Sequence, residues 1–130
     1  MGRPAVNENR PQPLRKFPKS SRLLRHADFQ AVYNNGRKHF SANIAVFYRE
    51  RSQGTAARIG FTVGKALGGA VERNRIRRRL RSAVQKHLNQ LRVPLDIVMN
   101  PRKAVLHMDF ARLDSEVEQA LAAIQKGKTR

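Results

Sequence analysis

The sequence predicts an α+β protein, a two-layer α/β sandwich in which helices pack against a mixed sheet. Residues 42–48 and 58–64 alternate between apolar side chains and small or polar ones, as half-buried strands do. Residues 70–91 instead repeat apolar side chains at helical spacing, and a short apolar run follows at 95–99. A strand, a long helix and another strand in succession are typical of a crossover connection in a mixed sheet. With a helix at each end of the domain, the predicted order is α-β-β-α-β-α.

The first predicted helix covers residues 27–34. Phe29, Val32 and Tyr33 lie at positions i, i+3 and i+4, which places them on one face of that helix. The Asn35-Gly36 pair that follows is a strong turn signal and ends the helix. For each aromatic side chain in this half of the sequence, a core position and a base-stacking position are both open, and core is the better supported.

The two alternating runs predict strands with contrasting faces. In the first, one face carries Ile44, Val46 and Tyr48, and the other carries Ala45 and Phe47. We expect the two runs to pair as antiparallel strands. In the second run, one face is unusually bare because it carries only Gly60, Thr62 and Gly64. Small residues allow close approach by a ligand or by a packed helix, and the pattern favours neither.

The long helix over residues 70–91 carries the main chemical signal. Six arginines fall between Arg73 and Arg81, and residues 73–92 contain no Asp or Glu. Glu72 is the only carboxylate nearby. Rows of guanidinium groups without carboxylates repel one another, so we expect the arginine rows to face outward and to bind a polyanion. A solvated, salt-bridged face and a membrane-surface helix are less favoured, because ion-pair partners and large apolar membrane anchors are lacking.

The last two elements are a buried strand over residues 95–99, ended by Asn100-Pro101, and a C-terminal helix that Asp109 would cap. The apolar stripe of this helix consists of Leu113, Val117, Ala120, Leu121 and Ile124. We expect residues 17–126 to form one domain, after a disordered basic, proline-containing tail over residues 1–16 and before a basic tip at 127–130.

Composition restricts the possible functions. The 130 residues contain 27 Lys and Arg against 9 Asp and Glu, a net charge of +18 that points to nucleic acid or an anionic surface. There is no cysteine, no apolar run near the roughly 20 residues of a membrane span, and no secretory signal. We therefore expect a cytoplasmic protein with no membrane association and no obligate protein partner.

Enzymatic side-chain machinery is not evident in the sequence. The four histidines are isolated, no carboxylates cluster near the basic helix, and the Gly-rich segment before that helix lacks the Lys-Ser/Thr of a P-loop. We expect no catalytic residue and no metal site on the protein.

The residues around the long helix resemble a known family. The run from Val63 to Arg81, with its Arg73-Asn74-Arg75 core, closely resembles the signature of the bacterial ribonuclease P protein subunit. The likeness extends to residues 28–33, Asp-Phe-Gln-Ala-Val-Tyr, and to Asp96-Ile97-Val98. It covers nearly all of residues 17–126.

The resemblance implies a protein cofactor of ribonuclease P, the endoribonuclease that removes the 5′ leader from precursor tRNA. In that family the RNA subunit is the catalyst and holds most of the Mg²⁺, and the fold is a sandwich with a four-stranded mixed sheet and a left-handed βαβ crossover. By motif position, the residues expected to bind the catalytic RNA are Lys65, Arg73, Asn74, Arg75, Arg77, Arg78 and Arg81. Those expected to bind the leader are Phe29, Tyr33, Tyr48 and Arg102. Charge and fold class leave open a structural RNA-binding protein, such as a ribosomal protein, and less favourably a DNA-binding protein.

Overall fold

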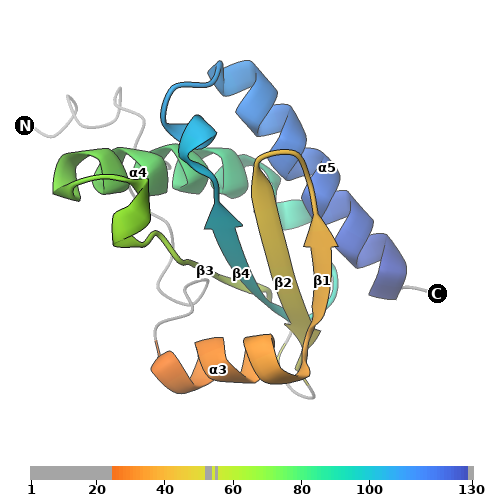
Figure 1. The fold of residues 1–130 in the computed structure, drawn as a ribbon. Coiled ribbons are helices and arrows are strands. Elements are labelled where there is room, and N and C mark those ends of the chain that lie inside the picture. The colour runs from red at the N-terminus through yellow and green to blue at the C-terminus, as the bar shows by residue number, and fades with distance from the viewer. Residues whose placement is uncertain (1–24, 52–53, 55, 129–130) are drawn as a thin grey trace, which may run out of the picture.

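The computed structural model describes residues 25–51, 54 and 56–128, with side chains described up to residue 126. The predicted tail over residues 1–16 and the end of the predicted C-terminal tip lie outside the described residues. Within the described residues, three α-helices pack on a four-stranded sheet, with α4 and α5 on one face and α3 on the other (Figure 1). The α+β class and the mixed sheet are as predicted.

The elements confirm most of the predicted boundaries and add one strand. In chain order they are α3 (His26–Asn35), β1 (Arg37–Phe40), β2 (Ile44–Glu50), β3 (Arg58–Phe61), η2 (Lys65–Leu67), α4 (Ala70–His87), η3 (Leu88–Gln90), β4 (Leu95–Pro101), η4 (Lys103–Leu106) and α5 (Phe110–Lys128). The order is therefore α-β-β-β-α-β-α. Within the described residues, no helix is both long and apolar enough to span a membrane.

The sheet has the order β1-β2-β4-β3. Strand β2 is antiparallel to β1 and to β4, whereas β3 is parallel to β4. The prediction that residues 42–48 and 58–64 pair with each other is wrong, because β4 lies between them. Strand β4 takes a central position since its side chains from Leu95 to Met99 are buried on both faces of the sheet. The β3-α4-β4 crossover is present, and its handedness stays a prediction of the resemblance.

Strand β1 was not predicted because only one of its four residues, Phe40, is a large apolar residue. Pairing with β2 defines it, with Arg37 opposite Tyr48 and Phe40 opposite Ala45. The turn before it depends on Gly36, where an added Cβ would lie 2.4 Å from the Val32 carbonyl oxygen and 2.5 Å from that of Tyr48. This close approach explains the glycine without any positive φ angle.

Strand β4 also continues further than predicted. Asn100 and Pro101 do not end it: they pair with Ala45 and Ile44 of β2. The ladder then extends to a hydrogen bond of 2.8 Å from the Arg102 N–H to the Asn43 carbonyl. Proline is tolerated here because it lies at the last position of the strand.

The main core lies between the sheet and the two long helices. It contains the predicted stripe of α4 (Ile76, Leu80 and Val84) and the predicted stripe of α5, packed against one face of β2, β3 and β4. The alternation in β2 is confirmed, because Ile44, Val46 and Tyr48 all enter this core. The carbonyl of Asp109 accepts hydrogen bonds from the N–H groups of Arg112 and Leu113, so α5 begins where predicted.

The other face of the sheet carries a smaller cluster under α3. Val32 and Val98 are fully buried there, and Phe29, Tyr33 and Phe47 pack around them. Helix α3 lies near the end of the sheet where β1 begins (Figure 1). The opposite end of this face, where β1 ends, is therefore farther from α3.

Candidate nucleic-acid interface

The start of α4 is built from two glycines and one carboxylate. Gly68 has φ +133°, a conformation that favours glycine, and an added Cβ would lie 2.9 Å from Cβ of Glu72. The Gly69 N–H donates to Glu72 Oε1 at 3.0 Å. The one carboxylate near the arginines is therefore engaged in closing the first turn of the helix.

The first part of the helix presents cations outward. Asn74, Arg75 and Arg78 are exposed, and neither Arg75 nor Arg78 forms an ion pair with a described carboxylate. Arg77 donates to Asn74 Oδ1 at 3.0 Å, and the Nε of Arg73 donates to the Gly68 carbonyl at 3.2 Å. These local bonds orient two of the guanidinium groups without neutralising their charge.

Arg79 departs from the expectation that the arginine rows face outward. Its Nη2 donates to the Met108 carbonyl, and its guanidinium carbon lies 5.8 Å from the centre of the Phe110 ring. Arg75, one turn earlier in the same row, is exposed. The difference arises because the start of α5 packs beside the later turns of α4, a long-range contact that helical periodicity does not report.

Arg81 is half-buried, and Lys65 is exposed on η2 before the helix. The residues predicted to bind the catalytic RNA therefore share one element and the loop before it. Their most accessible members are Lys65, Asn74, Arg75 and Arg78.

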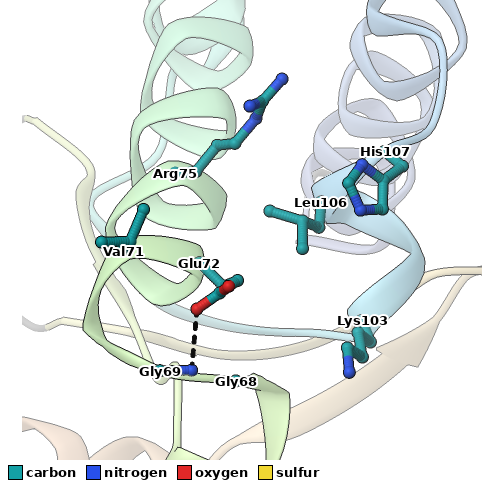
Figure 2. A pocket seen from close by; sticks show the side chains of 8 residues that line it. All are labelled: Gly68, Gly69, Val71, Glu72, Arg75, Lys103, Leu106 and His107. Carbon is teal, nitrogen blue, oxygen red and sulfur yellow. Dashed lines mark hydrogen bonds between the residues drawn. The ribbon is translucent and has the colours of Figure 1, made fainter.

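A cavity of about 400 Å³ lies beside this surface, between the start of α4 and η4. Figure 2 shows Arg75 and Glu72 on one wall, with Lys103, Leu106 and His107 on the other. Lys103 and His107 were not selected from the sequence. Lys103 adds its ammonium group and His107 its imidazole to this surface because β4 ends directly beside the loop before α4, so the crossover brings together residues some thirty positions apart.

A second polar surface lies on the α3 face of the sheet. The Tyr33 hydroxyl donates to Asn100 Oδ1 at 3.0 Å and bonds the Thr62 hydroxyl at 2.9 Å. Phe47 contacts the Tyr33 ring edge-on, with centroids 5.0 Å apart. Phe29 packs in the same cluster. The structure thus brings Phe29 and Tyr33 together, and adds Phe47, Thr62 and Asn100 to them.

Two predicted leader-binding residues lie apart from this cluster. Tyr48 is only 7 % exposed and belongs to the main core on the opposite face of the sheet, which strand alternation requires once Phe47 faces α3. We therefore leave Tyr48 out of the α3-face surface. Arg102 is exposed just beyond the end of β4, next to the turn between β1 and β2.

An ion-pair network centred on the buried Asp96 links helix α3 to the sheet. The Asp96 side chain accepts hydrogen bonds from Arg58 at 2.8 and 2.9 Å and from Arg51 at 2.7 Å. Burial alone would raise the pKa of Asp96, but the hydrogen bonds from Arg58 and Arg51 outweigh it and hold the pKa below its ordinary value. Arg58 also lies 3.7 Å from Asp28 of α3, so the network links α3, β3 and β4.

The described residues contain no group of three His, Asp or Glu side chains that could hold a metal ion. What the site does offer is exposed guanidinium and ammonium groups on one side of a small sheet and aromatic side chains on the other. Together these features are typical of nucleic-acid-binding proteins, here on an α+β fold.

The comparisons with known proteins identify the family. The Ribonuclease P family model matches residues 17–125. The ribonuclease P protein component of Symbiobacterium thermophilum is 40 % identical over 101 residues, which cover 78 % of this chain and 88 % of the relative. That of Finegoldia magna is 36 % identical over 97 residues, covering 75 % and 84 %.

Solved structures of ribonuclease P proteins have the same fold as this chain. The Staphylococcus aureus ribonuclease P protein superposes with a TM-score of 0.73 at 27 % identity, over 82 % of this chain and 97 % of the other. The Thermotoga maritima protein has the same fold, with a TM-score of 0.71 at 24 % identity, over 78 % and 96 %. The chain belongs to the ribonuclease P protein family, and thus to the protein components of an endoribonuclease.

Proposed function

We propose that this protein binds the catalytic RNA of ribonuclease P through α4 and the 5′ leader of precursor tRNA through the α3 face of the sheet, and so promotes removal of the leader in the cytoplasm. The observation that carries the proposal is the exposed, unneutralised cationic surface around Arg75 and Arg78 in a member of this family. Guanidinium groups bind phosphate oxygens in a fixed geometry, and each phosphate neutralised releases counterions.

The α3 face suits a different ligand. Phe29, Tyr33 and Phe47 supply aromatic surface, and Thr62 and Asn100 supply hydrogen-bonding groups beside it. Unpaired bases expose ring faces that stack on aromatic side chains, whereas paired bases do not. The single-stranded leader is therefore the better partner for this face, with Arg102 available for its phosphates.

We further propose that the Mg²⁺ needed for cleavage is held mainly by the RNA subunit. Three of the described carboxylates are engaged within the protein: Asp96 with two arginines, Glu116 with Ser41 and Asn43, and Glu72 with a backbone N–H. The protein's own contribution is to bring phosphates of both RNAs close together and to offset their charge.

Reconstitution tests the proposal. Precursor tRNA should be cleaved at the mature 5′ end only when the catalytic RNA is present, and adding the protein should lower the Mg²⁺ concentration required. Cleavage by the protein alone, or an unchanged Mg²⁺ requirement, would contradict the proposal. A ribosomal role would instead appear as sedimentation with ribosomes and no effect on leader removal.

Tyr33→Ala separates the two surfaces in the same assay. The variant should lose affinity for precursor tRNA while its affinity for mature tRNA and for the catalytic RNA stays close to wild type. An equal loss for precursor and mature tRNA would show that the α3 face does not bind the leader.

A further inference from the structure

One row of side chains crosses the sheet on the α3 face, and Tyr33 of α3 contacts this row at Asn100 and Thr62. The strand register places Phe40 of β1 beside Ala45 of β2, and Ala45 beside Asn100 of β4. The Thr62 N–H bonds to the Met99 carbonyl, which continues the row toward β3. Phe40 lies at the end of β1 that points away from α3 (Figure 1).

Phe40 is unusual for its exposure. It is 66 % exposed, and Val71 is the only other large hydrophobic residue so exposed in the described part of the chain. Its ring meets Phe47 at 84° with centroids 6.5 Å apart. A perpendicular contact covers at most one face of the Phe40 ring, and its neighbour Ala45 is too small to cover the other. The fold therefore leaves an aromatic face open at the edge of a basic protein.

Asn100 supplies a donor at the other end of the row. Its Oδ1 accepts a hydrogen bond from the Tyr33 hydroxyl, which also bonds Thr62. These bonds orient the side-chain amide, while its NH₂ group has no partner among the described residues. A half-exposed, oriented donor needs an acceptor on whatever binds beside it.

The spacing of the two groups fits one nucleobase. Neighbouring strands lie about 4.8 Å apart, so Phe40 and Asn100, two strands from each other, are separated by roughly 10 Å across Ala45. A base stacked on Phe40 and lying over Ala45 would bring one edge to Asn100. Exposed Lys38, on the same face of β1 as Phe40, is available for a flanking phosphate.

We propose that Phe40, Ala45 and Asn100 form a binding site for one unpaired base of the precursor tRNA leader, selective for a base with a carbonyl oxygen at position 4 of a pyrimidine or position 6 of a purine, namely uracil or guanine. The base stacks on Phe40 and accepts a hydrogen bond from the Asn100 amide. This inference rests on the proposed function of the α3 face, and extends it to the exposed edge of the sheet.

The test measures kcat/KM of the reconstituted holoenzyme on precursor tRNAs that each carry one abasic leader position. In the wild type, removing the base at one leader position should lower kcat/KM about five- to tenfold, the range expected for a single stacked base at an exposed site. In Phe40→Ala, the intact substrate should lose about the same factor, and the abasic change at that position should cost nothing more. Phe40→Trp should restore the wild-type profile.

His39→Ala is the matched control, because His39 is the next residue of β1 but faces the opposite side of the sheet. It should retain the wild-type abasic profile. Asn100→Asp replaces the NH₂ donor by an acceptor, and should shift the preference at the same leader position from uracil or guanine toward cytosine or adenine, which carry an amino group at position 4 or 6 in place of the carbonyl oxygen.

The outcomes separate this site from the broader proposal. If no leader position matters to the wild-type holoenzyme, leader binding by the protein fails altogether. If the wild type shows a sensitive position and Phe40→Ala shows the same profile, the α3 face can still bind the leader but the Phe40 site is overturned. An unchanged base preference in Asn100→Asp would overturn the assigned selectivity.

Discussion

The two faces of the sheet are built on different principles. One face is covered by α4 and α5 and buries a large aliphatic core, with Ile76, Leu80 and Leu121 among its fully buried members. The other is covered only in part by α3, over a cluster with two fully buried residues, Val32 and Val98. Phe29, Tyr33 and Phe47 pack around this cluster, and the Thr62 hydroxyl and the Asn100 amide lie beside Tyr33.

The difference shows how a small basic domain can hold two binding surfaces. On the first face the sheet itself is hidden, and the outward side of α4 carries the cations. On the second face the sheet is itself the surface, because α3 is short and leaves one end uncovered. Apolar stabilisation comes mainly from the first face, while the second also depends on polar networks such as that of Asp96.

The largest effect should come from Asp96→Ala. The substitution leaves Arg51 and Arg58 without the carboxylate that joins them, and breaking such a buried pair typically costs about 3–5 kcal/mol. Urea denaturation of the free protein measures the free energy of unfolding. The control is Asp114→Ala. Because the Asp114 carboxylate is more exposed, this substitution should lower the free energy of unfolding by about 1 kcal/mol or less. Equal losses would mean that the Asp96 network does not stabilise the α3 face.

The next largest effects should come from truncating core side chains, and the loss of stability should differ between the two faces. Leu80→Ala, in the main core, should lower the free energy of unfolding by about 2–5 kcal/mol. Val32→Ala, in the small cluster, should cost about 1–2 kcal/mol, since fewer methyl groups are removed from a thinner layer. The same denaturation assay measures both. A larger loss from Val32→Ala would reverse the proposed division of stability.

Arg78→Ala and Arg79→Ala should separate binding from folding on α4. The exposed Arg78 should contribute about tenfold to affinity for the catalytic RNA, and its loss should reduce the slope of log K against log salt by about 1. Arg79→Ala should lower stability instead, because Arg79 bonds Met108 and packs on Phe110. A salt titration of RNA binding measures the slope. An equal change in slope for the two variants would show that Arg79 also reaches the RNA.

The smallest effect should be a loss of stability in acid. Burial opposes ionisation of Asp96 and Glu116, but hydrogen bonds outweigh burial and hold each pKa below its ordinary value of 3.8 or 4.5. The stabilisation is thus present above those values and is lost as the pH falls through the lower folded values. Urea midpoints should be flat near neutral pH and decline below about pH 4. Glu116→Gln should show a smaller decline, and an unchanged decline would exclude Glu116 as a contributor.

The sequence predicted the elements with strong periodicity and missed the weak one. Helix α4 and the stripe of α5 were evident from apolar spacing, and α4 begins at the predicted residue. Strand β1 was missed because an Arg-Lys-His-Phe edge strand is specified by its pairing with β2 rather than by its own composition. The placement of β4 between β2 and β3 was missed for the same reason: partners in a sheet are chosen by contacts distant in sequence.

For the functional surfaces, the sequence by itself determined the excess of positive charge, the arginine helix without carboxylates and the motif that marks the family. Only the tertiary structure decided which groups face outward and which share a surface. In the folded chain, Arg79 bonds Met108 and Tyr48 lies in the core. Phe40 and Asn100 lie in one row because both are in register with Ala45 of β2. The physical reason is that helical periodicity is local, whereas strand register and helix packing are set by contacts between residues far apart in the chain.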